Sequence, residues 1–129
     1  MIYLESSAIV KLVVPEPESE ALRRHLAPTG EWISSALARV EVLRALRRRN
    51  PPEEAVRDAE RMLSRIALVP LNDPVLDAAA EVGPTTLRSL DGIHLATALS
   101  LFGLDSFVTY DQRLFAAASA AGLRTMAPA

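Results

Sequence analysis

The sequence contains no cysteine, and this absence removes several classes of protein at once. Without thiolates there can be no zinc site built on cysteine, no thiol nucleophile and no disulfide framework. The chain also suits a reducing compartment, so we expect a cytoplasmic protein. Its apolar runs are far shorter than the roughly 20 residues that a membrane-spanning helix needs, and its opening residues, MIYLESSAIVKL, do not have the pattern of a secretion signal. We therefore expect no association with a membrane.

The chain also lacks a strong charge of either sign and has few aromatic side chains. Its net charge is −2 and its aromatic content is 5%, so we expect neither a general attraction to nucleic acid nor extensive base stacking. Lys11 is the sole lysine, and the other basic residues are arginines. The segment RALRRRN, close behind Glu41, is expected to bind phosphate groups through Arg44, Arg47, Arg48 and Arg49. Weaker candidates for the same role are Arg113 and Lys11. The alternative is a solvated helix face on which Glu41 pairs with Arg44.

The length of 129 residues, half of them apolar, fits one compact domain over residues 1–129. Short apolar runs alternate with helical patterns, which predicts strands near residues 2–5, 31–34, 68–71, 106–109 and 123–126. Helices are expected over residues 8–14, 18–26, 36–49, 53–67, 74–82, from 89 or 91 to 102, and 111–121. Strands separated by helices form a parallel sheet covered on both faces. We therefore expect an α/β fold, an α/β/α sandwich with a central, mainly parallel sheet of about four or five strands.

Local signals predict where some of these elements begin. Ser6 or Ser7 is expected to cap the first helix, Ser35 the helix over 36–49, and Asp73 the helix over 74–82. Pro28 and Gly30 predict a turn over residues 28–30. The helices over 36–49 and 53–67 are expected to form a hairpin whose apolar groove accepts a partner helix.

Four carboxylates interrupt or end apolar stretches, in the contexts IYLESSAIV, LARVEVL, SLDGIHLA and FVTYDQRL. They are Glu5, Glu41, Asp91 and Asp111. Glu5 and Asp111 follow predicted strands and the other two lie early in predicted helices, so all four can meet beyond the carboxyl ends of the strands, where open α/β sheets bind ligands. Carboxylates that meet in a folded protein raise each other's pKa unless a proton or a cation compensates them. We interpret the cluster as a divalent-metal site.

Each of these acids also has a local explanation. Asp91 and Asp111 are placed to cap helices or to complement a helix dipole, and Glu41 to form a surface ion pair. His94 stands three residues after Asp91 among apolar neighbours, where a hydrogen-bonded structural histidine is favoured over a catalytic base. His25 is expected on a helix surface.

In their order and spacing, these four segments resemble the PIN-domain ribonucleases of the VapC toxin type, over essentially the whole chain. The resemblance assigns to the catalytic metal site the acids Glu5, Glu41, Asp91 and Asp111, with the polar supports Ser7 and Thr109. It also implies Mg²⁺ or Mn²⁺, endonucleolytic cleavage of RNA by a metal-activated water, a homodimer, and inhibition by a small VapB-like antitoxin.

One residue departs from the family pattern, which has Asp where this chain has Glu5. The extra methylene moves the carboxylate by up to about 1.5 Å, and Mg²⁺ tolerates little deviation from an octahedral shell. Because a misplacement of about 1 Å can lower a rate by about 10²-fold, we expect a weakened nuclease.

Two other classes fit part of the pattern. A catalytically silent PIN-fold binding module would bind metal or an antitoxin without cleaving RNA. A phospho-acceptor receiver domain would also place acids at strand ends, but it requires paired acids after the first strand and a lysine after a late one. The segment ESS and the single lysine, Lys11, do not supply them.

Overall fold

A computed structural model describes residues 1–28 and 30–129, and its centre is a sheet of five strands. They are β1 (Ile2–Leu4), β2 (Trp32–Ser35), β3 (Ala67–Val69), β4 (Ser106–Val108) and β5 (Thr125–Met126). The strand order is β3-β2-β1-β4-β5, and every neighbouring pair is parallel. The predicted α/β fold with a parallel sheet is therefore confirmed. The predicted turn over residues 28–30 includes Thr29, which lies outside the described residues.

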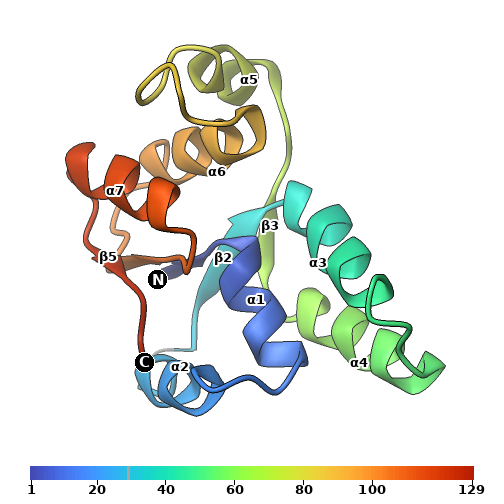
Figure 1. Cartoon of the computed structure of the whole chain (residues 1–129). Helices are drawn as coiled ribbons and strands as arrows, with labels where there is room; N and C mark the ends of the chain where they lie inside the picture. The colour runs from blue at the N-terminus through green and yellow to red at the C-terminus, as the bar shows by residue number, and fades with distance from the viewer. Residues whose placement is uncertain (29) are drawn as a thin grey trace.

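Helices cover both faces of this sheet. In the described residues they are α1 (Ser6–Val13), α2 (Ser19–Leu26), α3 (Leu37–Arg47), α4 (Glu53–Ser64), α5 (Asp73–Ala79), α6 (Ser89–Leu99) and α7 (Gln112–Ala120). Helices α1 to α4 gather on one side of the sheet and α5 to α7 on the other (Figure 1). This is the predicted three-layer arrangement. None of the helices in the described part of the chain is both long and apolar enough to cross a membrane.

The alternation of side chains along β1 separates two apolar cores. Ile2 and Leu4 point into the core shared with α1 to α4, while Tyr3 points into the core shared with α6 and α7. All three side chains are almost fully buried. Such burial on both faces is typical of the central strand of a parallel sheet, and it explains why this strand is a continuous apolar run.

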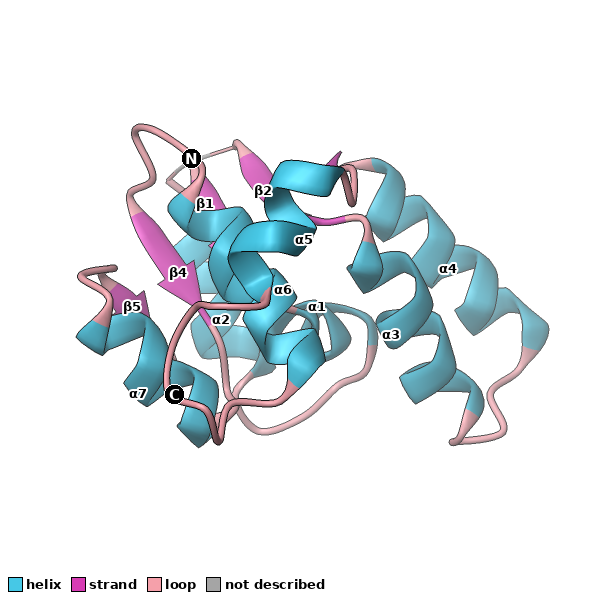
Figure 2. Ribbon diagram, turned by 90° about the horizontal axis from the view of Figure 1, so that it is seen from above, coloured by secondary structure: helices cyan, strands magenta, loops and turns pink. Residues whose placement is uncertain are grey.

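Helices α3 and α4 lie side by side and extend away from β4 and β5 (Figure 2). The predicted helical hairpin is therefore confirmed. Three predicted helix ends were wrong: α4 ends at Ser64 rather than at residue 67, α6 at Leu99 rather than at residue 102, and α5 at Ala79 rather than at residue 82. In the first case the chain is already in β3 at residue 67, and in the second it turns at Gly103, whose φ is +73°.

Three predicted helix caps were also wrong. Helix α1 is capped by Glu5, whose carboxylate accepts a hydrogen bond from the Ser7 N–H, because the hydroxyls of Ser6 and Ser7 are bound to other partners. Helix α5 is capped by Asn72 rather than by Asp73. The N-cap of α3 is Ala36 rather than Ser35, whose hydroxyl lies one residue earlier and accepts from the Leu37 N–H. The predicted cap Asp111, which accepts from the Leu114 N–H, is confirmed.

The fold brings the predicted site to one edge of the sheet. Glu5 directly follows β1, and Asp111 follows the neighbouring strand β4 within three residues. Asp91 lies in the first turn of α6, which packs closely on α5. Gly92 permits this packing, because a Cβ there would lie 3.1 Å from the carbonyl oxygen of Ala79.

Candidate metal centre

Glu5 is held by three donors that all reach one of its two carboxylate oxygens. The side chain is buried, with 5% of the residue exposed. Its Oε2 accepts hydrogen bonds from the Ser7 hydroxyl at 2.5 Å, the Ser7 N–H at 3.2 Å and the Thr109 hydroxyl at 2.8 Å. None of the hydrogen bonds among the described residues ends on Oε1. The second oxygen is therefore available to a ligand.

The predicted polar supports, Ser7 and Thr109, connect Glu5 to the segment after β4. The Ser7 hydroxyl accepts from the Tyr110 N–H at 2.9 Å, and the Thr109 hydroxyl accepts from the Asp111 N–H at 3.1 Å. Each hydroxyl thus donates to Glu5 and accepts from the backbone that leads into α7. This arrangement uses both capacities of a hydroxyl and fixes its orientation.

Glu41 enters the site from α3 and is held by different groups. Its Oε1 accepts a hydrogen bond from the Ser6 hydroxyl at 2.6 Å and lies 2.7 Å from Nε2 of His94. Burial raises the pKa of Glu41, but the hydrogen bonds from His94 and Ser6 outweigh it and hold the pKa below its ordinary value. Glu41 is therefore a carboxylate at neutral pH, and since a carboxylate only accepts, Nε2 of His94 carries the proton between them.

His94 is fully buried and links the site to the core. Its Nδ1 lies 2.7 Å from the hydroxyl of Tyr3, and the two rings meet edge to face. The Tyr3 ring in turn stacks on Phe107 at a centroid distance of 4.9 Å. Burial raises the pKa of Tyr3 well above its ordinary range, so Tyr3 is a neutral phenol. The predicted hydrogen-bonded histidine is thus observed, and one of its partners is a site carboxylate.

Asp91 and Asp111 share a single cation, Arg88. The guanidinium reaches Oδ2 of Asp91 from Nε at 3.3 Å and Oδ2 of Asp111 from Nη2 at 3.1 Å. The other oxygen of Asp111 accepts the capping hydrogen bond from Leu114 at 2.9 Å. Burial and the neighbouring charge of Asp111 raise the pKa of Asp91, although Arg88 acts in the opposite direction. The charge of this acid pair is therefore only partly compensated.

Two of the four predicted acids lie together with a histidine rather than with the other two acids. One ligand atom each from Glu5, Glu41 and His94 lies within 4.8 Å of the others, and Asp91 and Asp111 stand outside this set. The Thr109 hydroxyl connects the two groups, since it donates to Glu5 and accepts from the Asp111 N–H. The two carboxylates suit a divalent cation, with Asp91 and Asp111 beside them as further oxygen donors, while both ring nitrogens of His94 are already bound to Glu41 and Tyr3.

Three of the predicted phosphate-binding arginines, Arg44, Arg47 and Arg113, line hollows of the surface. A groove along α3 is lined by Ala36, Arg39, Val40, Leu43, Arg44 and Arg47. Arg113 lines a hollow along α7, and Arg49 lies 3.9 Å from Glu16. The alternative ion pair between Glu41 and Arg44 does not occur among the described residues, because the carboxylate turns to Ser6 and His94 instead.

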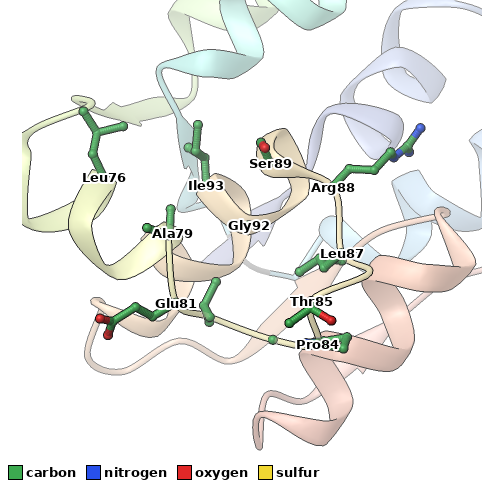
Figure 3. Close-up of a pocket in the computed structure, with 13 residues that line it drawn as sticks. Leu76, Ala79, Glu81, Pro84, Thr85, Leu87, Arg88, Ser89, Gly92 and Ile93 are labelled. Atoms are coloured by element: carbon green, nitrogen blue, oxygen red, sulfur yellow. The ribbon is translucent and has the colours of Figure 1, made fainter.

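A hollow near the site is lined by none of the four acids. It lies between α5, the start of α6 and the loop that joins them (Figure 3). Its lining is mainly apolar and includes Leu76, Ala79 and Ile93. Figure 3 shows the side chain of Arg88 extending away from these residues. Arg88 and Glu81 line the hollow, but Asp91 and Asp111, the two acids that Arg88 binds, do not.

Sequence reasoning missed Arg88 and gave Ser6 no role beyond helix capping. Arg88 stands three residues before Asp91, and this spacing, known to bring helix neighbours together, was the available signal. The spacing between Glu41 and Arg44 is the same, yet only the first pair forms. The contact of His94 with Glu41 joins residues 53 positions apart, and no local pattern predicts it.

Comparison with known proteins gives consistent results over nearly the whole chain. The model of a family described as "PIN domain" matches residues 2–120. Ribonuclease VapC46 of Mycobacterium tuberculosis is 48% identical over 128 residues, which cover 98% of this chain and 97% of that protein. Ribonuclease VapC47 of the same species is 41% identical over 133 residues, with 99% and 97% covered.

Two solved structures share the fold. The crystal structure of Mycobacterium tuberculosis VapC20, described as a sarcin-ricin loop cleaving toxin, aligns with a TM-score of 0.76 at 17% identity and covers 99% of this chain and 100% of that one. A toxin-antitoxin complex from Klebsiella pneumoniae aligns with a TM-score of 0.70 at 16% identity, covering 90% and 91%. At these identities the likeness concerns the fold alone.

The contact between Tyr3 and His94 gives a testable prediction about stability. Replacing Tyr3 with Phe leaves Nδ1 of His94 buried without its partner, which costs about 1–3 kcal/mol of unfolding free energy. Urea denaturation measures this loss. Tyr110→Phe is the matched control, because it removes a hydroxyl that bonds the Pro128 carbonyl at a partly exposed position. A loss no larger in Tyr3→Phe than in Tyr110→Phe would contradict the prediction.

Proposed function

This chain belongs to the PIN-domain family, and on that premise we propose that it is a divalent-metal-dependent endoribonuclease that acts as the toxin of a toxin–antitoxin pair. The observation that carries the proposal is the convergence of Glu5, Glu41 and His94 beside Asp91 and Asp111 at one edge of the sheet. Relatives named ribonucleases, at 41% to 48% identity over almost the full chain, support the reaction. We further propose that residues 1–129 form a single domain, since the first and last strands belong to one sheet.

The residues that would hold the cation are Glu5 and Glu41, with Asp91 and Asp111 completing the shell. Their carboxylate oxygens are the ligands that Mg²⁺ and Mn²⁺ accept, and we propose either ion as the cofactor. When bound, such an ion supplies Lewis-acid activation of water and neutralises charge on the phosphodiester. Cleavage by a metal-activated water needs no side-chain nucleophile.

The role of the surrounding side chains is to fix the carboxylates before substrate arrives. Ser7 and Thr109 hold one oxygen of Glu5, and Ser6 and His94 hold one oxygen of Glu41. Groups that are already oriented lose little free energy to reorganisation during the reaction. The partly compensated charge on Asp91 and Asp111 adds attraction for a cation.

The substrate and partners are proposed from the arginines and from the relatives. Arg44, Arg47, Arg48 and Arg113 are proposed to hold RNA phosphates outside the acidic edge. A small VapB-like antitoxin is proposed as inhibitor, because a solved toxin-antitoxin complex shares this fold. The grooves beside α3, lined by Val40 and Leu43, are proposed to accept its helix or a second copy of the chain in a homodimer. We place the activity in the cytoplasm.

The alternative is a PIN-fold module that binds metal or an antitoxin without cleaving RNA. The observation that favours it is Glu5, which stands where the family pattern has Asp. The receiver-domain alternative was wrong, since the PIN-domain model matches residues 2–120.

Replacing Asp91 with Asn separates the enzyme from the silent module. We expect Mn²⁺-dependent cleavage of a labelled total-RNA preparation to fall by about 10²-fold or more, since one oxygen donor is lost. The variant should remain folded. The pKa of Asp91 is raised in the folded protein, so its ionised form opposes folding, and this opposition is relieved as the pH falls through that raised pKa.

Asp91→Asn removes this charge. We therefore expect the variant's thermal unfolding midpoint, measured at pH 7 with EDTA, to be no lower than that of the parent protein. Asp77→Asn, at an exposed position of α5, is the matched control and should retain cleavage. Absence of metal-dependent cleavage in the parent protein would support the silent module. Cleavage that survives in Asp91→Asn would show that the activity belongs to another site.

Replacing Glu5 with Asp tests the proposed attenuation. Removal of the methylene moves the carboxylate by up to about 1.5 Å, and we expect the cleavage rate to rise by up to about 10²-fold. Rates are compared on one RNA preparation at saturating Mn²⁺. Glu31→Asp makes the same change at an exposed position before β2, at the opposite edge of the sheet, and should change nothing. Equal rates for the parent and Glu5→Asp would reject the attenuation.

A further inference from the structure

Arg88 lies against two of the site's acids, and the proposed reaction gives its side chain no role. It directly precedes α6, and its side chain is 67% exposed. The guanidinium joins Asp91 and Asp111, which lie 20 residues apart in the sequence and enter from different helices. Among the described residues, Arg88 is the one cation paired with either of these acids.

The guanidinium therefore stands where a divalent ion would be attracted. Two carboxylates that face a single positive charge retain a net negative charge, and Asp91 is largely buried. The hydrogen bond to Asp91 and the charges of both acids raise the pKa of Arg88, so its charge is permanent. A dication between the acids would satisfy them more completely and would repel the guanidinium at close range.

The released side chain would remain at the site. Its exposed, extended position leaves it free to turn, and a guanidinium has five N–H donors arranged to bind phosphate oxygens in pairs. In Arg88 the Nε and Nη2 groups now donate to carboxylates, and the same two groups would donate to the oxygens of a phosphodiester. The nearest available anion in an RNA complex is a phosphate beside the bound ion.

We propose that Arg88 is a tethered cation with two successive partners: it binds Asp91 and Asp111 in the ion-free protein, and it binds a backbone phosphate of RNA once a divalent ion has replaced it between them. The inference rests on the proposed function. It assigns Arg88 both a competitor's role toward the metal and a positioning role toward the substrate. These roles predict effects of opposite sign in a single variant.

The first measurement is Mn²⁺ binding without RNA, followed by the loss of the electron paramagnetic resonance signal of free Mn²⁺. Arg88→Gln removes the competing charge, so we expect its dissociation constant for Mn²⁺ to fall about two- to fivefold, the range of an exposed ion pair. Arg88→Lys keeps a charge and should lie between this variant and the parent. Arg124→Gln is the control, because Arg124 is exposed just before β5, at the opposite edge of the sheet. Unchanged or weaker Mn²⁺ binding in Arg88→Gln would overturn the competitor's role.

The second measurement is fluorescence anisotropy with a labelled single-stranded RNA of mixed sequence, using Ca²⁺ in place of Mn²⁺ to limit cleavage. With Ca²⁺ we expect Arg88→Gln to bind the RNA several-fold more weakly, with a salt dependence lower by about 0.7 in slope. With EDTA, where Arg88 is held by the acids, the variant and the parent should bind alike. Equal binding in both conditions would overturn the positioning role.

The outcomes keep this inference separate from the proposed function. A parent protein that binds Mn²⁺ but cleaves no RNA would refute the nuclease, while the Mn²⁺ titration of Arg88→Gln would still decide the competition. A parent that binds no Mn²⁺ would overturn both. Cleavage that proceeds normally while Arg88→Gln changes neither Mn²⁺ nor RNA binding would overturn the inference alone.

Discussion

The rest of the structure depends on one constraint, the free-energy cost of holding four carboxylates at the same edge of a parallel sheet. Different partners offset this cost at each carboxylate. Glu5 accepts from hydroxyls and a backbone N–H, and Glu41 from a hydroxyl and an imidazole. Asp91 and Asp111 share one guanidinium. Hydroxyls satisfy the hydrogen-bonding capacity of an oxygen but leave its charge in place. The edge therefore keeps an excess of negative charge, which is the property that a cation-binding site requires.

The register of β1 connects this edge to the apolar core. Tyr3 pairs with Phe107 of β4 and Ile33 of β2, and its ring stacks on Phe107. From that position its hydroxyl reaches His94, which contacts Glu41. Because successive side chains of a strand point to opposite faces, a slip of one residue would move Tyr3 into the other core. The packing of the sheet thus sets the position of a carboxylate that belongs to a distant helix.

The periodicity of apolar residues predicted the helices and strands, because it shows which side chains are buried. Burial of those side chains largely determines where helices and strands form. The apolar run Ile2 to Leu4 and the acid that ends it were visible in the sequence, as were the contexts of Asp91 and Asp111. These local features sufficed for the sheet and its layers, and for the position of Glu5 and Asp111 after the neighbouring strands β1 and β4.

The partners of the acids were not predictable in the same way. Glu41 has an arginine three residues after it and Asp91 has one three residues before it, yet only Asp91 pairs with its neighbour. The choice depends on which side chain of another segment arrives nearby, as His94 does for Glu41. The cap of α1 shows the same effect, since Ser6 and Ser7 cannot cap the helix while their hydroxyls serve Glu41 and Glu5. Contacts between distant segments decide these cases.

The same contacts bear on the proposed attenuation by the longer side chain at position 5. All donors to Glu5 reach a single oxygen, so the carboxylate is fixed and the additional methylene adds little freedom. The hydroxyls of Ser7 and Thr109 that fix it also bind the backbone N–H groups of Tyr110 and Asp111. A shift of the Glu5 carboxylate toward a better position would therefore strain the segment that places Asp111. The proposed effect of Glu in place of Asp is therefore one of position, which the surrounding hydrogen bonds would keep the site from correcting.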